Sequence, residues 1–215
     1  MYQRILFGLA IVFCLAQRTS SLMAEDQMTW VIAESSGRVV VLPDTVGRVA
    51  LTQGDQIAPG SRIQTMDDGR AILTRGEDVI IISPNSELIV PTSQPEFGTH
   101  LLQTIGRAMY KVTKRPSPHF EVDTPYLAAT VKGTTFEVSS DASGSAVRVV
   151  DGRVRVSDIR DGRSALVEAG QIARVDATRG LGPQIQAPPT INGGNANGTG
   201  GGSGGSGGKT GGGEP

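Results

Sequence analysis

The chain has 215 residues, of which 38% are hydrophobic and 19% are charged, and its formal net charge at pH 7 is −1. Such a small charge provides no strong basic field, so the composition argues against a nucleic-acid partner. The single cysteine, Cys14, lies in an N-terminal apolar run. Once that run is removed, the chain offers no disulfide framework, no thiolate zinc site and no cysteine nucleophile.

The N-terminal segment is typical of an export signal. A short positive region, residues 1–4, precedes the apolar run ILFGLAIVFCLA at residues 5–16. As a helix this run would rise about 18 Å, well short of the roughly 30 Å hydrocarbon core of a bilayer. We therefore expect a signal peptide over residues 1–24 and no permanent membrane span after its cleavage. Cleavage after Ser21 is the alternative to cleavage after Ala24.

The first strand-like segments follow this signal. Residues 27–32 contain the only tryptophan, and we expect a strand in which Trp30 anchors the core, with a mobile N-terminus as the alternative. The β-branched run RVVVL at residues 38–42 predicts a second strand. The turn dipeptides Gly54-Asp55 and Pro59-Gly60 come next, and they leave no room for a helix between them.

The tripeptide Asp-Gly-Arg occurs three times, beginning at Asp68, Asp151 and Asp161. Asp-Gly between apolar runs is a strong hairpin signal, because a type I′ turn requires positive φ at both central residues. Each tripeptide flanks a strand-like run, and the one at Asp151 is expected to join residues 146–150 and 154–156 in a hairpin. Strand-turn-strand units spaced at about ten residues predict a short β-helical or sandwich-like body.

Two apolar segments are less regular. Residues 79–82, VIII, lack alternation, which predicts a strand with both faces covered or a strand at a crossing between two sheets. Residues 100–112 carry apolar side chains at helical spacing, yet Leu102, Thr104, Ala108 and Tyr110 also fit an alternating strand. Gly106 lies in the middle of this segment, where it would cost a helix about 1 kcal/mol relative to alanine. The periodicity by itself does not decide between the two.

The C-terminal part changes composition abruptly. Short strand-like runs at residues 165–167 and 172–175 close the predicted body. Beyond them, residues 179–215 are rich in Pro, Gly and Ser and hold just over half of the 29 glycines. This composition cannot bury a core and predicts a disordered tail or tether.

The segment HFEVDTPYLAATVKGTTFEV, residues 119–138, is the most informative part of the chain. Apolar side chains recur in it at mostly two-residue spacing, with interruptions at Thr124-Pro125 and Gly133-Thr134. This pattern predicts two half-buried strands joined through tight bends. An alternating strand would expose Lys132, because Lys132 follows the apolar Val131.

This segment resembles the FecR-like periplasmic domain family, whose pattern is F-x-V-x-T-P-x-x-x-A-x-V-x-G-T-x-F-x-V. Each fixed position has a counterpart here: Phe120, Val122, Thr124, Pro125, Ala129, Val131, Gly133, Thr134, Phe136 and Val138. A second family pattern, L-x-x-G-D-x-I-x-x-G-x-x-I-x-T, is matched upstream by Leu51, Gly54, Asp55, Ile57, Gly60, Ile63 and Thr65. The two matching segments occur in the family's order.

In that family the domain commonly forms the periplasmic part of a regulator that relays an outer-membrane receptor's ferric-siderophore signal to an extracytoplasmic sigma factor. The resemblance therefore implies a β-rich sensory domain, and it favours a strand over a helix for residues 100–112. Only residues 1–4 precede the apolar run. The family's cytoplasmic anti-sigma region thus has no expected counterpart here, and the full transmembrane relay is not carried over.

Catalytic and metal-binding patterns are sparse. His100 and His119 are accompanied by no metal-ligand spacing such as H-x-x-x-H, which favours structural or surface roles for both. No serine lies in a nucleophile elbow, and no carboxylate pair is marked out by its spacing. We predict no catalytic residue, no cofactor and no metal site. The ten residues of the downstream motif are expected to be structural, with ligand contact as the alternative, because proline and glycine at strand ends meet backbone φ requirements.

These observations predict an all-β domain over residues 28–178, with many short strands in a sandwich or β-helix-like wrap, followed by the disordered Gly-rich tail at residues 179–215. The expected function is a non-catalytic exported sensory module of the periplasm or cell envelope. Its partner is expected to be an envelope protein or surface ligand, bound by strand addition at the exposed edges of residues 120–138. The alternative is a structural surface or matrix protein in which the glycine tail is a spacer.

Overall fold

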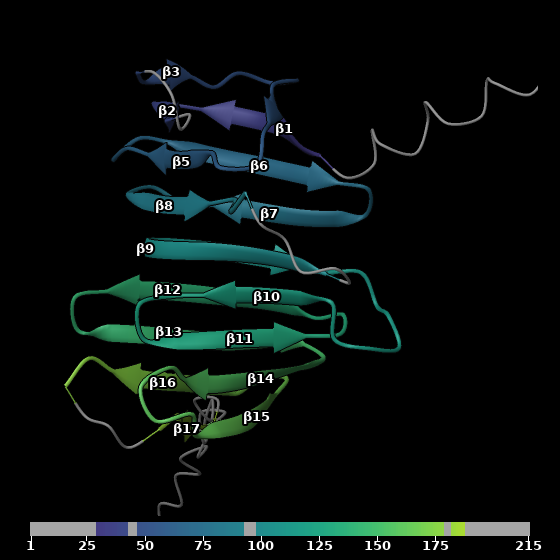
Figure 1. Cartoon of the computed structure of the whole chain (residues 1–215), viewed down its shortest axis with the longest axis vertical. Helices are drawn as coiled ribbons and strands as arrows, with labels where there is room; N and C mark the ends of the chain where they lie inside the picture. Colours follow the sequence, from purple (N-terminus) through teal and green to yellow (C-terminus); the bar gives the residue numbers. More distant parts are fainter. Residues whose placement is uncertain (1–28, 43–46, 93–97, 179–181, 188–215) are drawn as a thin grey trace, which may run out of the picture.

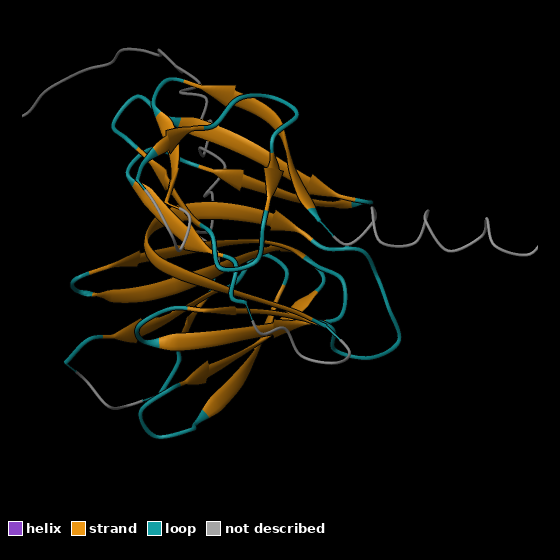
Figure 2. Cartoon of the chain, turned by 45° about the horizontal axis from the view of Figure 1, so that its top comes forward, coloured by secondary structure: helices purple, strands orange, loops and turns teal. Residues whose placement is uncertain are grey.

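The computed structural model describes residues 29–42, 47–92, 98–178 and 182–187. The described residues form an all-β structure with seventeen strands and no helix, so the predicted fold class is confirmed (Figure 2). None of these residues belongs to a helix that could cross a membrane. The predicted signal peptide at residues 1–24 and most of the predicted tail at residues 179–215 lie outside the described residues.

The strands vary in length from two residues to the 13 residues of β9. They are β1 (Trp30–Ser36), β2 (Val39–Leu42), β3 (Val49–Ala50), β4 (Gln56–Ile57), β5 (Arg62–Thr65), β6 (Arg70–Arg75), β7 (Asp78–Ile82), β8 (Ser86–Ile89), β9 (Thr99–Lys111), β10 (Phe120–Asp123), β11 (Leu127–Val131), β12 (Thr135–Asp141), β13 (Gly144–Asp151), β14 (Arg153–Asp158), β15 (Ser164–Glu168), β16 (Ile172–Asp176) and β17 (Gln184–Gln186). The last strand lies past residue 178, where the composition changes.

All seventeen strands belong to one continuous mixed sheet that folds into two layers (Figure 1). The layer that we call sheet A has the order β4-β1-β6-β7-β9-β12-β13-β16-β17. The layer that we call sheet B has the order β3-β2-β5-β8-β9-β10-β11-β14-β15. The chain passes repeatedly from one layer to the other, so it combines the predicted sandwich with the predicted wrap.

The core lies between the two layers and is centred on four aromatic rings. Trp30 is 2% exposed, and its ring meets the ring of Phe120 edge-on with 6.4 Å between centroids. Tyr110 contacts Phe120 at 6.1 Å and stacks on Phe136 at 5.2 Å. The hydroxyl of Tyr110 donates to Gln103 Oε1 at 2.9 Å, which satisfies the polar end of a fully buried ring. The predicted first strand and its tryptophan anchor are therefore confirmed.

Strand β9 belongs to both layers. Its first half pairs with β8 and β10 in sheet B, and its second half pairs with β7 and β12 in sheet A. The change occurs at Gly106, whose φ of +91° is a conformation that side-chain-bearing residues rarely adopt. The backbone of Gly106 also lies against Ser86 at the start of β8. Gly106 thus lets one long strand turn from one sheet into the other.

The turn at Gly106 shifts the inward face of β9 by one residue. The inward side chains are Leu101 and Gln103 before the turn, and Ala108 and Tyr110 after it. The predicted strand over residues 100–112 is confirmed. The four residues that fit an alternating strand do not share one face: Ala108 and Tyr110 are buried, whereas Leu102 and Thr104 lie on the outer face of sheet B. A phase shift inside one strand explains why no single periodicity fits this sequence.

Two of the three Asp-Gly turns do not form hairpins. The turn at Asp68 leads from β5 in sheet B to β6 in sheet A, and the turn at Asp151 leads from β13 in sheet A to β14 in sheet B. The predicted hairpin at Asp151 is therefore wrong. Only the turn at Asp161 closes a hairpin, in which Ser157 of β14 lies opposite Ser164 of β15. An Asp-Gly turn signals a chain reversal, but burial of the following strand decides which sheet that strand joins.

The sequence predicts a strand at residues 79–82 with both faces covered, but only one face of β7 is fully buried. Ile80 and Ile82 are buried in the core, whereas Val79 and Ile81 are half-buried on the outer face of sheet A. The strand lies between β6 and β9 in sheet A. The run lacks alternation because the outer face of β7 is also partly apolar. Its half-buried side chains pack on neighbours within that face.

The buried carboxylate of Asp158 predicts acid sensitivity. Asp158 is fully buried and accepts hydrogen bonds from Arg160 N at 3.0 Å, Nε at 3.1 Å and Nη2 at 2.9 Å. The side-chain hydrogen bond from Arg160 lowers the pKa of Asp158 against the opposing effect of burial. Because the folded pKa lies below the unfolded value, this stabilisation is present above about pH 4 and is lost as the pH falls through the folded pKa.

We expect Asp158→Asn to lower the urea midpoint at pH 7 and to weaken its dependence on pH between 5 and 2. The reason is that asparagine keeps the shape of the side chain but removes the charge that titrates. Urea unfolding of both proteins, followed by circular dichroism at several pH values, measures this. Parallel pH profiles for the two proteins would contradict the assigned role of Asp158.

Candidate functional site

The candidate site is built by the parallel pairing of β9 and β10. All other strand pairs among the described residues are antiparallel. In the parallel register His100 lies beside Glu121, and Leu102 lies beside Asp123. Side chains two residues apart share a face of a strand. His100, Glu121 and Asp123 therefore project together from the outer face of sheet B, and we call them the β9–β10 site.

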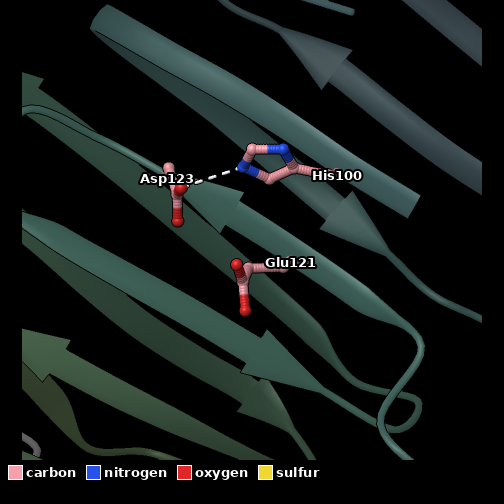
Figure 3. Close-up of side chains that lie close together, drawn as sticks. All are labelled: His100, Glu121 and Asp123. Carbon is pink, nitrogen blue, oxygen red and sulfur yellow. Dashed lines mark hydrogen bonds and ion pairs between the residues drawn. The ribbon is translucent and has the colours of Figure 1, made fainter. Parts of the chain in front are cut away.

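The ligand atoms of the three side chains all lie within 4.8 Å of one another (Figure 3). His100 Nε2 and Asp123 Oδ2 are 2.8 Å apart. The hydroxyl of Thr130, on the adjacent strand β11, donates to Glu121 Oε2 at 2.9 Å. Asp123 Oδ1 is buried and has no hydrogen-bond partner among the described residues. The site therefore combines one imidazole and two carboxylates, and one oxygen of the Asp123 carboxylate has no hydrogen-bond partner in the described part of the chain.

Sequence reasoning gave these residues no joint role. Spacings such as H-x-x-x-H relate ligands within one segment of the chain. Here His100 comes from β9, whereas both carboxylates come from β10. Glu121 and Asp123, at alternate positions of one strand, are the only local signal for the site. The contribution of His100 depends on which strand lies beside β10, and no local pattern of the chain specifies that neighbour.

A second polar group lies on the same face of sheet B, around Glu87 of β8. Its carboxylate accepts hydrogen bonds from Arg62 at 2.7 Å, Gln64 at 2.5 Å and Thr104 at 2.7 Å. Burial raises the pKa of Glu87, but the hydrogen bonds from Gln64, Thr104 and Arg62 outweigh it and hold the pKa below its usual range. The hydrogen bonds from these three neighbours hold the Glu87 carboxylate in place. We therefore assign Glu87 a structural role at the surface.

A surface hollow of about 580 Å³ lies at the end of β9 and the start of β12, on sheet A. Its charged lining residues are Glu77, Lys111, Lys114 and Asp151, and Lys114 Nζ lies 3.7 Å from an Asp151 oxygen. Neither histidine is among its lining residues. The charges in this hollow are mixed in sign and exposed to solvent, an arrangement typical of ordinary protein surface.

The ten motif residues occupy β10, β11, β12 and the turns between them. Eight have exposures of 7% or less: Phe120, Val122, Thr124, Ala129, Val131, Thr134, Phe136 and Val138. Gly133 is half-buried, and Pro125 is exposed. Lys132 is exposed, as predicted. The structure therefore brings the apolar members of the motif together in the core, next to the aromatic cluster.

The polar and glycine positions of the motif form the turns. Thr124 Oγ1 accepts hydrogen bonds from the N–H groups of Tyr126 and Leu127 at 3.2 and 3.0 Å, which closes the β10–β11 turn. Thr134 Oγ1 donates to Arg153 O at 3.0 Å and joins the start of β12 to β14. Gly133 has a φ of +143°, and an added Cβ would lie 2.2 Å from Lys114 Cα. Each of these positions therefore has a backbone reason for its residue type.

The predicted strand addition at residues 120–138 is wrong. Strand β10 is paired on one side with β9 and on the other with β11. Strand β11 is paired with β10 and β14, and β12 is paired with β9 and β13. None of the three has a free edge. The strands with one partner only, among those described, are β3, β4, β15 and β17, and β15 is the longest of them.

Comparison with known proteins agrees with the resemblance seen in the sequence. Residues 61–155 match the family model described as FecR protein. No curated protein is significantly similar to the chain. Two crystal structures of a candidate anti-sigma factor from Parabacteroides distasonis ATCC 8503, at 1.65 and 2.50 Å resolution, share the fold. Each has 20% sequence identity and a TM-score of 0.51.

The structural likeness covers 59% of this chain and 59% of the bacterial protein, so it extends over little more than half of either. The family match is placed more narrowly. It runs from the start of β5 into β14 and includes all ten motif residues and the whole β9–β10 site. Residues 61–155 of this chain are therefore similar to the FecR family.

Proposed function

We propose that this chain is a non-catalytic, exported sensory module of the bacterial cell envelope that recognises another protein. The observation that carries the proposal is the FecR match over residues 61–155, on a fold shared with a candidate anti-sigma factor. The apolar run at residues 5–16 supports export, and FecR domains are typically periplasmic. In this proposal residues 28–178 form the recognition domain, residues 1–24 direct export, and the glycine-rich part of residues 179–215 that follows β17 acts as a tether.

The motif residues are proposed to be structural and to take no part in catalysis. Their burial supports this, because side chains such as Phe120, Val131 and Phe136 have no surface to offer a ligand. The hydrogen bonds of Thr124 and Thr134 are made to backbone groups of the same domain. The motif would thus maintain the frame on which the recognition surface is carried.

We place the recognition surface at the free edge of β15. Among the described strands, β15 pairs with β14 alone, and Leu166 at its centre is 48% exposed. The N–H of Asp158 donates to Arg163 O at 2.8 Å, so these two residues form a hydrogen-bonded pair. Hydrogen-bonded and non-hydrogen-bonded pairs alternate along an antiparallel ladder. The backbone N–H and C=O of Leu166, three residues further along, therefore point away from β14. An edge strand with free N–H and C=O groups is a template for an extended segment of a partner protein.

Leu166→Pro tests this surface. Proline removes the outward N–H of residue 166 without removing a hydrogen bond to β14. We expect the variant to fold and to lose at least tenfold in capture of the envelope protein that the parent chain retains, as measured by quantitative pull-down and mass spectrometry. Leu166→Thr is the matched control, because threonine is smaller and polar but keeps the N–H.

The two variants separate the possible outcomes. Loss with proline and retention with threonine supports backbone pairing at β15. Equal capture by both variants and the parent chain would refute the β15 surface. Equal loss in both would also refute strand addition, since it would assign recognition to the leucine side chain.

A further inference from the structure

We propose that His100, Glu121 and Asp123 bind a divalent first-row transition-metal ion, for which Zn²⁺ is the probe. The proposal goes beyond sensory recognition, since nothing in the proposed function requires an ion. It rests on the convergence of three ligand groups within 4.8 Å on the outer face of sheet B. It also rests on a buried carboxylate oxygen that the described residues leave without a partner.

The ligand types indicate the class of metal. Zn²⁺ is bound by histidine nitrogen and carboxylate oxygen, and sites with three protein ligands keep a further position for water or another ligand. Imidazole also suits iron, nickel and copper, whereas Mg²⁺ and Ca²⁺ favour sites made of oxygen ligands. One imidazole with two carboxylates therefore favours a transition metal over Mg²⁺ or Ca²⁺. Copper(I) is disfavoured because the site contains no sulfur ligand.

Zinc binding would need adjustment of the side chains, with the His100–Asp123 pair moving slightly apart and wider pairs moving closer together. Ligand atoms about 2.0–2.1 Å from a tetrahedral zinc are about 3.3 Å from one another. His100 Nε2 and Asp123 Oδ2 are already 2.8 Å apart, and the remaining pairs of ligand atoms lie within 4.8 Å. All three side chains are half-buried, so they have room to adjust while the backbone stays in place.

The backbone beneath the site is held firmly. Strand β10 is paired on both sides, and β9 is paired on both sides where it carries Leu102. The hydrogen bond from Thr130 holds one oxygen of Glu121 in place. A ligand that is oriented by a neighbour in this way is typical of metal centres, whose outer partners set the direction of the ligands. Ligands on rigid strands are also positioned more precisely than ligands on loops.

A simple ion pair accounts for only part of the arrangement. The contact between His100 and Asp123 satisfies Oδ2, but it leaves Oδ1 buried and without a partner. An unsatisfied buried acceptor is unfavourable, by about 1–3 kcal/mol in general. A bound cation would interact with both oxygens of this carboxylate, and it would also bring Glu121 into the same network. The metal therefore explains the carboxylate pair and the unsatisfied oxygen together.

The test uses the full chain, produced without an affinity tag and treated with a chelator. Titration calorimetry with ZnCl2 is expected to show one ion bound per chain with a dissociation constant in the micromolar range. His100→Gln and Asp123→Asn should each weaken binding at least tenfold, because each removes one of three ligands. Glu34→Gln is the matched control, since Glu34 is an exposed carboxylate on β1 with no part in the site.

Thermal unfolding gives a second readout that separates ligand loss from misfolding. Zn²⁺ should raise the Tm of the parent chain and of Glu34→Gln, and it should leave the Tm of His100→Gln unchanged. If His100→Gln does not fold, Glu121→Gln takes its place with the same expectation. Absence of stoichiometric binding by the parent chain would overturn the proposal. Undiminished binding by the folded site variants would overturn it equally.

Discussion

Replacing Gly106 with alanine is expected to destabilise the protein by about 2–5 kcal/mol, a large part of the 5–15 kcal/mol of a typical domain. The residue has a φ of +91°, and an added Cβ would lie 2.2 Å from Ser86 Oγ and 2.4 Å from Ser86 Cα. Ser86 Oγ also hydrogen-bonds the backbone of Arg107 at 2.9 and 3.1 Å. The methyl group would therefore push β8 away from the turn by which β9 joins the two sheets.

Gly54→Ala is the control that separates backbone strain from collision. Gly54 has an almost identical φ of +92°, but no atom lies within 4 Å of the position that a Cβ would take. The control should lose only the conformational part, about 1–2 kcal/mol. Urea unfolding by circular dichroism measures both variants. Equal losses would mean that Ser86 yields freely, and the assigned role of the close contact between β8 and β9 would then be wrong.

Replacing Phe120 with alanine is expected to lose about 3–5 kcal/mol, as is usual for a fully buried aromatic ring. Phe120 is 2% exposed and contacts both Trp30 of β1 and Tyr110 of β9. Its removal would leave a cavity where three strands of the two sheets meet. Chemical unfolding should show a lower midpoint, and the near-ultraviolet signal of Trp30 should change because its ring contact is lost.

Ile159→Ala is the matched control for that substitution. Ile159 is also a large apolar residue, but it is 52% exposed in the turn after β14. We expect a change within about 0.5 kcal/mol, as for most surface substitutions. A loss for Phe120→Ala as small as that of the control would show that the aromatic cluster collapses to fill the cavity. It would also remove the proposed structural reason for phenylalanine at the first position of the motif.

The two proposed surfaces both lie on sheet B, but each proposal can be refuted without affecting the other. The recognition edge uses backbone groups of β15, whereas the β9–β10 site uses side chains in the middle of the sheet. Leu166→Pro should therefore leave Zn²⁺ binding intact, and His100→Gln should leave partner capture at β15 intact. A negative result for either surface does not count against the other.

The chain's own sequence determined the fold class, most of the strands and the residue types of the motif. These are local properties, because two-residue alternation, β-branched runs and the φ preferences of glycine and proline act within a few residues. The burial of Trp30 and the exposure of Lys132 could be predicted in this way, whereas the strand over residues 100–112 was favoured over a helix only by the family resemblance.

Only the tertiary structure decided which segments lie beside each other. It placed the turn at Asp151 between two sheets, passed β9 from one layer to the other at Gly106, and gave β15 a single partner among the described strands. It also brought His100 beside the carboxylates of β10. The physical reason is that backbone hydrogen bonds between strands are chemically alike at every position. The choice of neighbour therefore depends on burial of the whole core rather than on any local pattern.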